Sequence, residues 1–267
     1  MKEIRHVALD LDGTLYRGQT VFQTTVPFLE LLGQLKIGHT FLTNNSSRSV
    51  AGYQAKLRAM GIPARREQIY TSAQSTIEFL RAKWPSVKSI FILGTTSMAE
   101  TFGEAGYSIL PDDPRKKPDA VVAGFDPTLT YAKLGRAAWW ISHGVPYFAT
   151  NPDAVCPTDQ PTVLVDCGSI VAALEKATGR APEAILGKPD VAMLRGILRR
   201  HKLKPRELAM VGDRFYTDME MARRAKVFGI LVLTGETTAA QAALRRPRPD
   251  MIAPSLAELG GELAASR

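Results

Sequence analysis

Short apolar runs alternate along the chain with segments of helical periodicity. The runs contain few polar residues, which is typical of strands that are covered on both faces of a sheet. Repeated alternation of such strands with helices predicts a parallel sheet and an α/β protein. The predicted strands are HVALDL (6–11), GHTFLT (38–43), SIFILG (89–94), DAVVAG (119–124), PYFAT (146–150), ELAMVG (207–212) and FGILVLTG (228–235), and the clearest predicted helices span 46–60, 168–179, 190–201 and 217–225.

The bulk composition is that of a globular protein. With 267 residues, 45% of them hydrophobic, the chain can bury the core of one large domain or two ordinary ones. No stretch approaches the roughly 18 apolar residues of a membrane helix, and MKEIRHVALD lacks the apolar centre of a secretory signal. Cys156 and Cys167 are too few for a disulfide framework and fit no zinc-ligand spacing. We therefore expect a cytoplasmic protein without a membrane partner.

The charge is strongly basic, but it is dispersed along the sequence. The formal net charge of +8 could indicate a nucleic-acid partner, because lysine and arginine bind phosphates. The basic residues nevertheless come in short groups without interleaved aromatics. This distribution argues against a nucleic-acid surface and favours solvated helix faces with a bias toward anionic substrates. The groups are RKK (115–117), RR (199–200), RR (223–224) and RRPR (245–248).

Two acids interrupt the end of the first apolar run. In an open parallel sheet, ligands bind beyond the carboxyl ends of the strands, where Asp10 and Asp12 are placed. Residues i and i+2 of an extended segment point the same way, so these two carboxylates can converge on one space. The alternative is that DLDGT is only a turn, because Asp-Gly is a frequent turn pair.

Polar residues also follow three later runs. Thr43 and Asn44 lie at the end of the second run, in FLTNNSS. The serines that follow are expected to begin a helix, and the N-terminus of that helix should bind phosphate. Lys188 lies in ILGKPD at a predicted helix start, where an ammonium can neutralise phosphoryl oxygens. Asp213 and Asp218 follow the run AMVG, and hard oxygen ligands of this kind suit Mg²⁺. Each position alone could be a helix cap or a solvated side chain, but together they predict an active site.

Taken in order, DLDGT, LTNNS, GKPD and GDRFYTD resemble the four motifs of the haloacid dehalogenase-like (HAD) superfamily. ATNPD (149–153), EKATGRAPEAILGKPD (175–190) and VLTGETT (232–238) resemble its NagD-like branch, which includes p-nitrophenyl phosphatases. The resemblance implies a Rossmann-like HAD core with an inserted type-C2 α/β cap domain. The interval between Thr43 and Lys188 is much longer than that between Lys188 and Asp213, so the insertion belongs there. We expect a discontinuous core of 1–72 and 185–267 and a cap of 73–184.

The chemistry of a phosphate dianion suggests a role for each acid. A carboxylate can attack such a substrate only if a metal ion and fixed cations cancel the developing charge. Asp10 is then the nucleophile that forms an aspartyl-phosphate, and Asp12 is the general acid and base. We expect Mg²⁺ to bind the Asp10 carboxylate, the Asp12 backbone carbonyl and Asp213, with Asp218 in an outer position.

The phosphate itself needs donors besides the metal. Thr43 and Lys188 are expected to hold its oxygens, and by the resemblance Asn44 also lines the phosphate pocket. The cap should select the small phosphorylated metabolite, with Asn151, Asp153 and the segment 166–170 as candidates. The resemblance further allows a homodimer formed through the cap.

The sequence can also be compared with the requirements of three other functions. A haloalkanoic acid dehalogenase attacks carbon without Mg²⁺ or a leaving-group acid, and Asp12 argues against it. A noncatalytic binding module would be expected to lose Asp10 or Lys188, and both are present. A phosphomutase or phosphotransferase would use nearly the same motifs, so the sequence separates it only weakly from a phosphatase.

Overall fold

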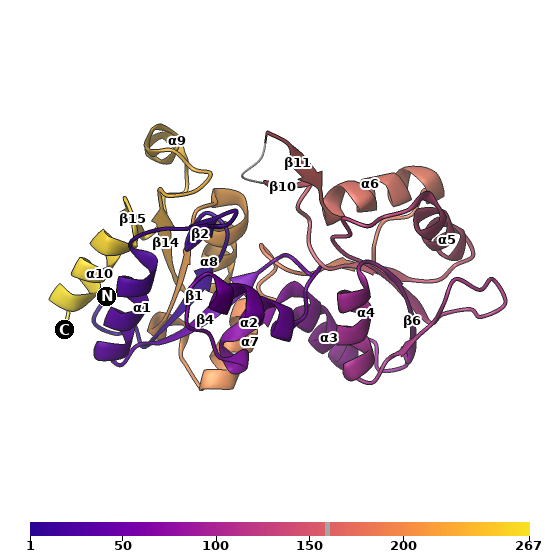
Figure 1. Cartoon of the computed structure of the whole chain (residues 1–267), viewed down its shortest axis with the longest axis horizontal. Coiled ribbons are helices and arrows are strands. Elements are labelled where there is room, and N and C mark those ends of the chain that lie inside the picture. The colour runs from indigo at the N-terminus through magenta and orange to yellow at the C-terminus, as the bar shows by residue number, and fades with distance from the viewer. Residues whose placement is uncertain (158–160) are drawn as a thin grey trace. The chain divides into compact units, whose positions relative to one another are not determined.

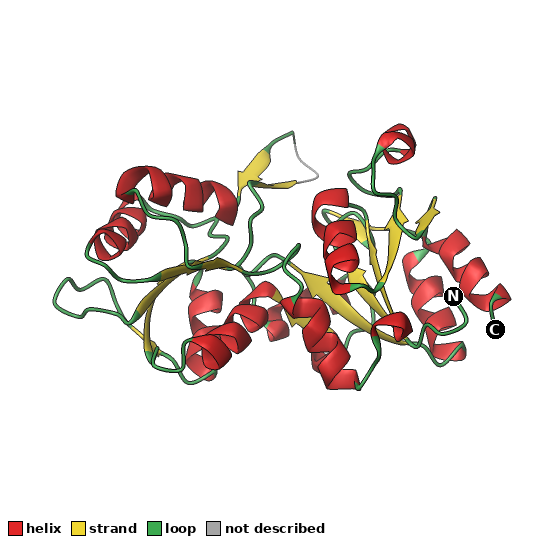
Figure 2. Ribbon diagram, turned by 180° about the vertical axis from the view of Figure 1, so that it is seen from behind, coloured by secondary structure: helices red, strands yellow, loops and turns green. Residues whose placement is uncertain are grey.

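The computed structural model describes residues 1–157 and 161–267. The chain forms two compact units, of which the first contains residues 1–43, 53–70 and 193–267 and the second contains 44–52 and 71–192. Figures 1 and 2 show that each unit is a sheet covered by helices, as the alternation of apolar runs predicts. The domain boundaries that we expect from the motifs, 1–72 with 185–267 and 73–184, remain a prediction.

The first unit is built on a six-stranded sheet in the order β15-β14-β13-β1-β4-β5. The buried strand β1 lies at its centre and pairs in parallel with both β13 and β4, so that His6 faces Leu208 on one side and Gly38 on the other. The carboxyl ends of these parallel strands therefore lie at the same edge of the sheet. The strands are β1 (His6–Asp10), β4 (Gly38–Thr43), β5 (Ile69–Thr71), β13 (Leu208–Gly212), β14 (Phe228–Val232) and β15 (Met251–Ala253).

Helices cover both faces of this sheet. Ala8, Leu42 and Met210 pack on one face against apolar side chains of α7 and α8. The helices α1 and α10 pack side by side, on the opposite side of the sheet from α7 and α8 (Figure 1). The helices are α1 (Thr25–Gln34), α2 (Val50–Ala59), α7 (Ala192–His201), α8 (Glu220–Ala225), α9 (Ala239–Leu244) and α10 (Leu256–Ala265), with short turns η1 (Arg66–Gln68), η2 (Pro205–Glu207) and η3 (Phe215–Met219).

The second unit is a five-stranded sheet in the order β12-β9-β8-β6-β7. Its strand pairs are parallel, and alternate residues of β6 and β8 point to opposite faces. One face packs on α5 and α6, with Trp140 in the core, and the other packs on α3 and α4. The elements are α3 (Ser72–Lys83), β6 (Ser89–Leu93), α4 (Thr96–Glu104), β7 (Ser108–Ile109), β8 (Ala120–Ala123), α5 (Tyr131–Ser142), β9 (Tyr147–Ala149), α6 (Cys167–Thr178) and β12 (Ala184–Ile185).

Two short antiparallel pairs complete the fold. In the first unit β2 (Tyr16–Arg17) pairs with β3 (Thr20–Val21), and in the second β10 (Val155–Pro157) pairs with β11 (Val163–Val165). Among the described residues, no helix has the length and apolar character needed to cross a membrane.

Two helix starts differ from the sequence prediction. The helix expected at 46 begins at Val50, and Ser49 rather than Ser46 caps it by accepting a hydrogen bond from the Gly52 amide at 3.1 Å. The Ser46 hydroxyl instead lies 2.9 Å from the hydroxyl of Thr150. The helix expected at 217 begins at Glu220, because residues 215–219 form a wider π-helical turn. A π-turn inserts an extra residue into a helix, and such turns are often found at functional sites.

Candidate active site

Three carboxylates meet at the edge of the first sheet. Asp10 is the last residue of β1, Asp213 directly follows β13, and Asp218 lies in the turn η3. All three are buried, and one oxygen of each lies within 4.8 Å of the others. Their proximity follows from the parallel pairing of β1 with β13, which brings the two strand ends together. Of the predicted site residues, these three form one cluster.

Glycines enclose this cluster. A Cβ atom at Gly13, Gly212 or Gly235 would overlap with the carboxylate of Asp213 or Asp218. At Gly13 the backbone also has φ of +84°, a conformation that side chains other than glycine rarely adopt. The backbone can therefore approach the carboxylates closely, and it leaves little room for them to turn away from one another.

The electrostatics of the cluster are those of a cation site. Burial, followed by the charges of Asp10 and Asp218, raises the pKa of Asp213 to about 7. Its Oδ2 atom accepts a hydrogen bond from the Glu236 amide at 2.6 Å, whereas Oδ1 is buried and has no hydrogen-bond partner among the described residues. A small hard divalent cation would satisfy that oxygen and offset the repulsion, so the residues present fit Mg²⁺.

Asp12 has a different environment from the cluster. Its Oδ2 accepts a hydrogen bond from the Tyr16 hydroxyl at 3.3 Å, and that hydroxyl in turn accepts one from Lys56 Nζ at 3.1 Å. Burial raises the pKa of Asp12, and the nearby Lys56 ammonium opposes this shift. Burial and the Asp12 charge raise the pKa of Tyr16 well above its usual range, so the phenol stays a donor. Asp12 therefore has the environment of a carboxyl group that can hold a proton.

The second unit holds another group of polar residues. The Asn44 side chain accepts a hydrogen bond from the Lys188 amide at 2.6 Å and donates to the Lys188 carbonyl and to Asp153 Oδ2, both at 3.0 Å. Asn151 donates to the Asn44 carbonyl at 3.1 Å. The side-chain amide of Asn44 thus fixes the backbone of Lys188, which favours a positioning role over direct contact with phosphate.

The backbone around Lys188 is as restricted as that around the acids. Gly187 has φ of +76°, and a Cβ there would lie 2.6 Å from the Thr150 carbonyl oxygen and 2.8 Å from Asn44 Oδ1. Lys188 itself is buried, and so is Thr43, the last residue of β4. The structure thus groups Lys188 with Asn44 in the second unit, whereas Thr43 and the four acids belong to the first.

The candidate specificity segments lie in the same unit as Lys188. Asp166 caps α6 by accepting a hydrogen bond from the Cys167 amide at 2.5 Å, and it lies 3.4 Å from Asn151 Nδ2. Part of the loop that contains Asn151 and Asp153, at 158–160, lies outside the described residues.

Some residues of the site were missed at the level of sequence. Tyr16 and Lys56 are 40 positions apart, and no spacing rule connects them. Glu236, whose amide binds Asp213, could have been found only through the segment VLTGETT, which follows a strand end as the motifs do.

Known proteins match this arrangement along almost the whole chain. Residues 7–108 match a family described as haloacid dehalogenase-like hydrolase, and residues 185–259 match one described as HAD-hydrolase-like. An acid sugar phosphatase of Staphylococcus epidermidis is 32% identical over 238 residues, which cover 89% of this chain and 90% of that protein.

Solved structures agree with the sequence matches. A 4-nitrophenylphosphatase of Thermotoga maritima is 36% identical with a TM-score of 0.91, and the match covers 97% of each chain. NagD of Escherichia coli K-12 is 28% identical with a TM-score of 0.84, over 96% of this chain and 98% of its own. A glycerol phosphate phosphatase of Mycobacterium tuberculosis, in complex with magnesium, is 33% identical with a TM-score of 0.89, over 97% of this chain and 78% of that one.

The fold, the acids at the strand ends and the sequence matches all indicate the same protein family. The chain belongs to the haloacid dehalogenase-like hydrolases and has their Rossmann-like fold. Within that family it is a phosphatase of the NagD-like branch.

Proposed function

We propose that the protein is a Mg²⁺-dependent phosphomonoesterase that acts on a small phosphorylated metabolite through an aspartyl-phosphate. The observation that carries this proposal is the buried group of Asp10, Asp213 and Asp218, with oxygens within 4.8 Å of one another. Three buried carboxylates repel one another strongly unless a cation lies between them. The magnesium bound by the glycerol phosphate phosphatase supports the choice of ion.

Each acid has a distinct part in the proposed reaction. The Asp10 carboxylate attacks phosphorus, and the bond from phosphorus to the leaving oxygen breaks as the aspartyl-phosphate forms. Asp12 gives its proton to the leaving alkoxide, and it then removes a proton from the water that cleaves the aspartyl-phosphate. Water thereby regenerates Asp10 and releases inorganic phosphate.

Metal and phosphate binding would be divided among the remaining residues. Asp10, the Asp12 backbone carbonyl and Asp213 would hold Mg²⁺, which when bound neutralises charge on the phosphoryl oxygens, and Asp218 would orient this group from an outer position. From the order of the motifs along the sequence, we assign the binding of phosphate oxygens to Thr43 and Lys188. Asn44 would act by holding the backbone of Lys188, as its hydrogen bonds suggest.

The substrate class is supported by the names of the relatives. They include an acid sugar phosphatase and a glycerol phosphate phosphatase, both of which act on phosphorylated polyols or sugars by name. We infer a sugar phosphate or similar metabolite, with p-nitrophenyl phosphate as an artificial substrate. Comparison of kcat/KM across a panel of phosphorylated metabolites identifies the substrate.

The nucleophile assignment can be tested directly. Asp10→Asn should lower kcat for p-nitrophenyl phosphate by at least about 1,000-fold, because an amide cannot form the acyl-phosphate. Chelation of divalent ions should abolish wild-type turnover, and added Mg²⁺ should restore it. Glu104→Gln, which removes an exposed acid of the second unit, is the matched control and should keep wild-type kinetics. An Asp10→Asn variant that folds and retains full activity contradicts the mechanism.

A further inference from the structure

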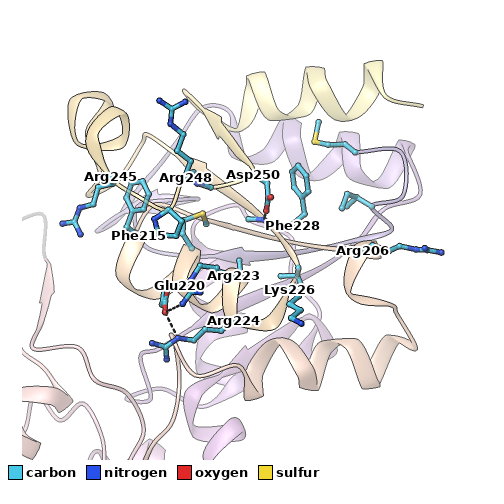
Figure 3. Close-up of a pocket in the computed structure, with 18 of the residues that line it drawn as sticks. Arg206, Phe215, Glu220, Arg223, Arg224, Lys226, Phe228, Arg245, Arg248 and Asp250 are labelled. Carbon is cyan, nitrogen blue, oxygen red and sulfur yellow. Dashed lines mark hydrogen bonds and ion pairs between the residues drawn. The ribbon is translucent and has the colours of Figure 1, made fainter.

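A groove of about 930 Å³ lies on the first unit, and no residue of the proposed reaction lines it. Its walls come from the turn η3, from α8 and from the segment between α9 and β15 (Figure 3). All of its lining residues belong to the first unit, so its shape is set within one compact body. We call it the basic groove.

The basic groove gathers positive charge that is dispersed in the sequence. Two of the short basic groups, RR (223–224) and RRPR (245–248), meet there. In total eight lysines and arginines line the groove against three acids. Figure 3 shows Arg245 and Arg248 along one side, with Arg224 and Lys226 along the other. Like charges at this density repel one another, so an anion in the groove would be bound favourably.

Several of these cations are not neutralised by the protein. Arg223 and Arg224 both pair with Glu220, at 2.7 and 2.6 Å. Asp250 accepts a hydrogen bond from the Gly229 amide at 2.7 Å. Among the described residues, Lys226, Arg245 and Arg248 form no ion pair with an acid of the groove. These three side chains are exposed and remain available to a ligand.

Aromatic side chains lie between the basic walls. Phe215 and Phe228 are half-buried and both line the groove. The Arg245 guanidinium lies 6.0 Å from the centre of the Phe215 ring, within the range of a cation–π contact. A ligand with a flat ring could stack here while its charged end reaches the arginines, since aromatic and guanidinium planes both bind nucleobases.

The volume of the basic groove suits one molecule of moderate size. Pockets for small molecules usually measure about 300–1,000 Å³, and the basic groove falls within that range. We propose that the basic groove binds a free nucleotide that carries two or three phosphates. The phosphates lie along the side of the groove that carries Arg245 and Arg248, and the base lies against Phe228. This site is independent of the proposed hydrolytic chemistry.

Calorimetric titration of the full-length protein with β,γ-imido-ATP tests the proposal. The analogue resists hydrolysis, and a chelator in the buffer removes metal-dependent binding at the carboxylate site. The wild type should bind it at least tenfold more tightly than AMP, because AMP offers only one phosphate to the two arginines. The double variant Arg245→Glu and Arg248→Glu should weaken binding at least tenfold. The charge-matched control, Lys83→Glu with Lys117→Glu in the second unit, should leave it unchanged.

A second variant separates a nucleotide site from a general anion patch. Phe228→Leu keeps the charge of the groove and removes the ring on which the base is placed, so it should weaken binding of β,γ-imido-ATP severalfold and leave binding of inorganic triphosphate unaffected. Equal affinity for the two ligands in the wild type would overturn the nucleotide assignment. Undiminished binding by the arginine double variant would also overturn it, provided that thermal unfolding shows the variant to be folded. Markedly tighter binding of a single-stranded oligonucleotide would point instead to a nucleic-acid surface.

Discussion

Gly235 illustrates how a residue without a side chain can shape the carboxylate cluster that we propose to bind Mg²⁺. A Cβ at this position would lie only 2.6 Å from Asp213 Cβ and would overlap with its carboxylate. Gly235→Ala should therefore displace Asp213 from Asp10 and Asp218. We expect the Mg²⁺ concentration for half-maximal activity to rise at least tenfold, which a titration of p-nitrophenyl phosphate hydrolysis with Mg²⁺ measures.

A glycine elsewhere in the first unit provides the control for this substitution. Gly261 lies in α10, where an added Cβ would meet no atom within 4 Å. Gly261→Ala should keep the wild-type Mg²⁺ dependence and add up to about 1 kcal/mol to the free energy of unfolding, because alanine favours a helix. If the two variants respond to Mg²⁺ alike, the close packing at Gly235 has no part in metal binding.

Asp12 allows a test based on the leaving group. Its proposed proton is needed by a poor leaving group such as a sugar alkoxide, but hardly by p-nitrophenolate. Asp12→Asn should therefore lower kcat by about 100-fold or more for a sugar phosphate and much less for p-nitrophenyl phosphate. Comparison of kcat over aryl and alkyl phosphates of graded leaving-group pKa measures this. A uniform decrease over the series would argue against the acid role.

The carboxylates could be predicted from the sequence, whereas their surroundings could not. Asp10 and Asp213 follow apolar runs that become neighbouring parallel strands, so position along the chain implies position in space. The contact of Lys56 with Tyr16 depends instead on how α2 meets the chain after β1. No local pattern encodes such a meeting, because it arises from packing of elements that are distant in sequence.

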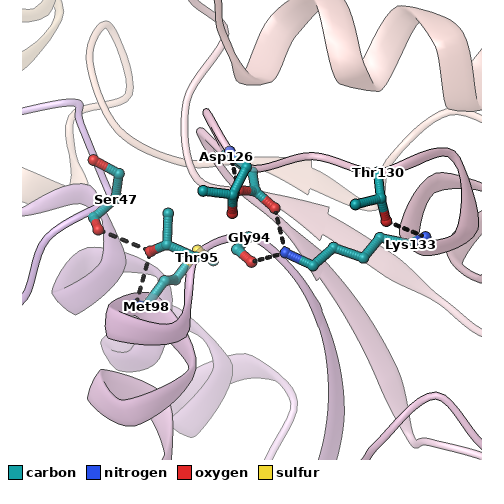
Figure 4. Close-up of polar contacts among 8 residues, drawn as sticks. Ser47, Gly94, Thr95, Met98, Asp126, Thr130 and Lys133 are labelled. Carbon is teal, nitrogen blue, oxygen red and sulfur yellow. Dashed lines mark hydrogen bonds and ion pairs between the residues drawn. The ribbon is translucent and has the colours of Figure 1, made fainter.

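An ion pair between a half-buried lysine and a buried carboxylate connects two elements of the second unit. Asp126 follows β8, and its fully buried carboxylate lies 2.9 Å from Lys133 Nζ of α5 (Figure 4). Lys133 also donates to the Gly94 carbonyl at 3.3 Å, at the end of β6. The Thr128 amide and hydroxyl provide further hydrogen bonds to Asp126, at 2.8 and 2.6 Å. The helix α5 is thereby fixed to the ends of two strands.

Removal of one partner should cost more stability than removal of both. Lys133→Met leaves the Asp126 carboxylate buried without its cation, so we expect the free energy of unfolding to fall by about 1–3 kcal/mol. Asp126→Asn in the same chain should recover part of this loss, because the amide needs no counter-charge. Urea unfolding of the two single variants and the double variant gives the coupling free energy between Asp126 and Lys133. Lys83→Met, at an exposed position, should change stability by no more than about 0.5 kcal/mol.

At the level of elements, strands were easier to predict from uniform apolar runs than the first residues of helices were. The run 38–43 coincides with β4, and Gly179 ends α6 with φ of 69° as its position predicts. The predicted start of α2 was wrong because several serines that could cap the helix lie close together, and the Ser46 hydroxyl contacts Thr150 instead. The β2–β3 hairpin was missed because its strands have only two residues each.

Two histidines of the first sheet, the buried His6 and the half-buried His39, should make the stability of the whole molecule depend on pH. Burial lowers the pKa of His6 to about 3 and that of His39 to about 4, below the ordinary value of 6.5. Between pH 6.5 and about 4 the unfolded chain binds protons that the folded chain does not. Each histidine therefore costs stability as the pH falls through this window, at up to about 1.4 kcal/mol per pH unit.

A histidine variant separates the contribution of His39 to the pH dependence of stability from the contributions of other titrating groups. His39→Gln removes one such group, so the stability of the variant relative to wild type should improve steadily from pH 7 to pH 5. Urea unfolding at a series of pH values, in the presence of a chelator, provides the measurement. A difference between the two proteins that does not vary with pH would contradict the neutral state of His39 in the folded chain.

The arrangement of the first sheet has a consequence for biosynthesis. β1 leaves the ribosome early, but its neighbour β13 is translated only after the whole second unit. The second unit can close its own sheet while the nascent chain is still growing, whereas β1 must wait with one edge unsatisfied. Partners that shield exposed strands during translation should therefore be needed most by the amino-terminal segment, and slow translation after residue 192 would prolong that need.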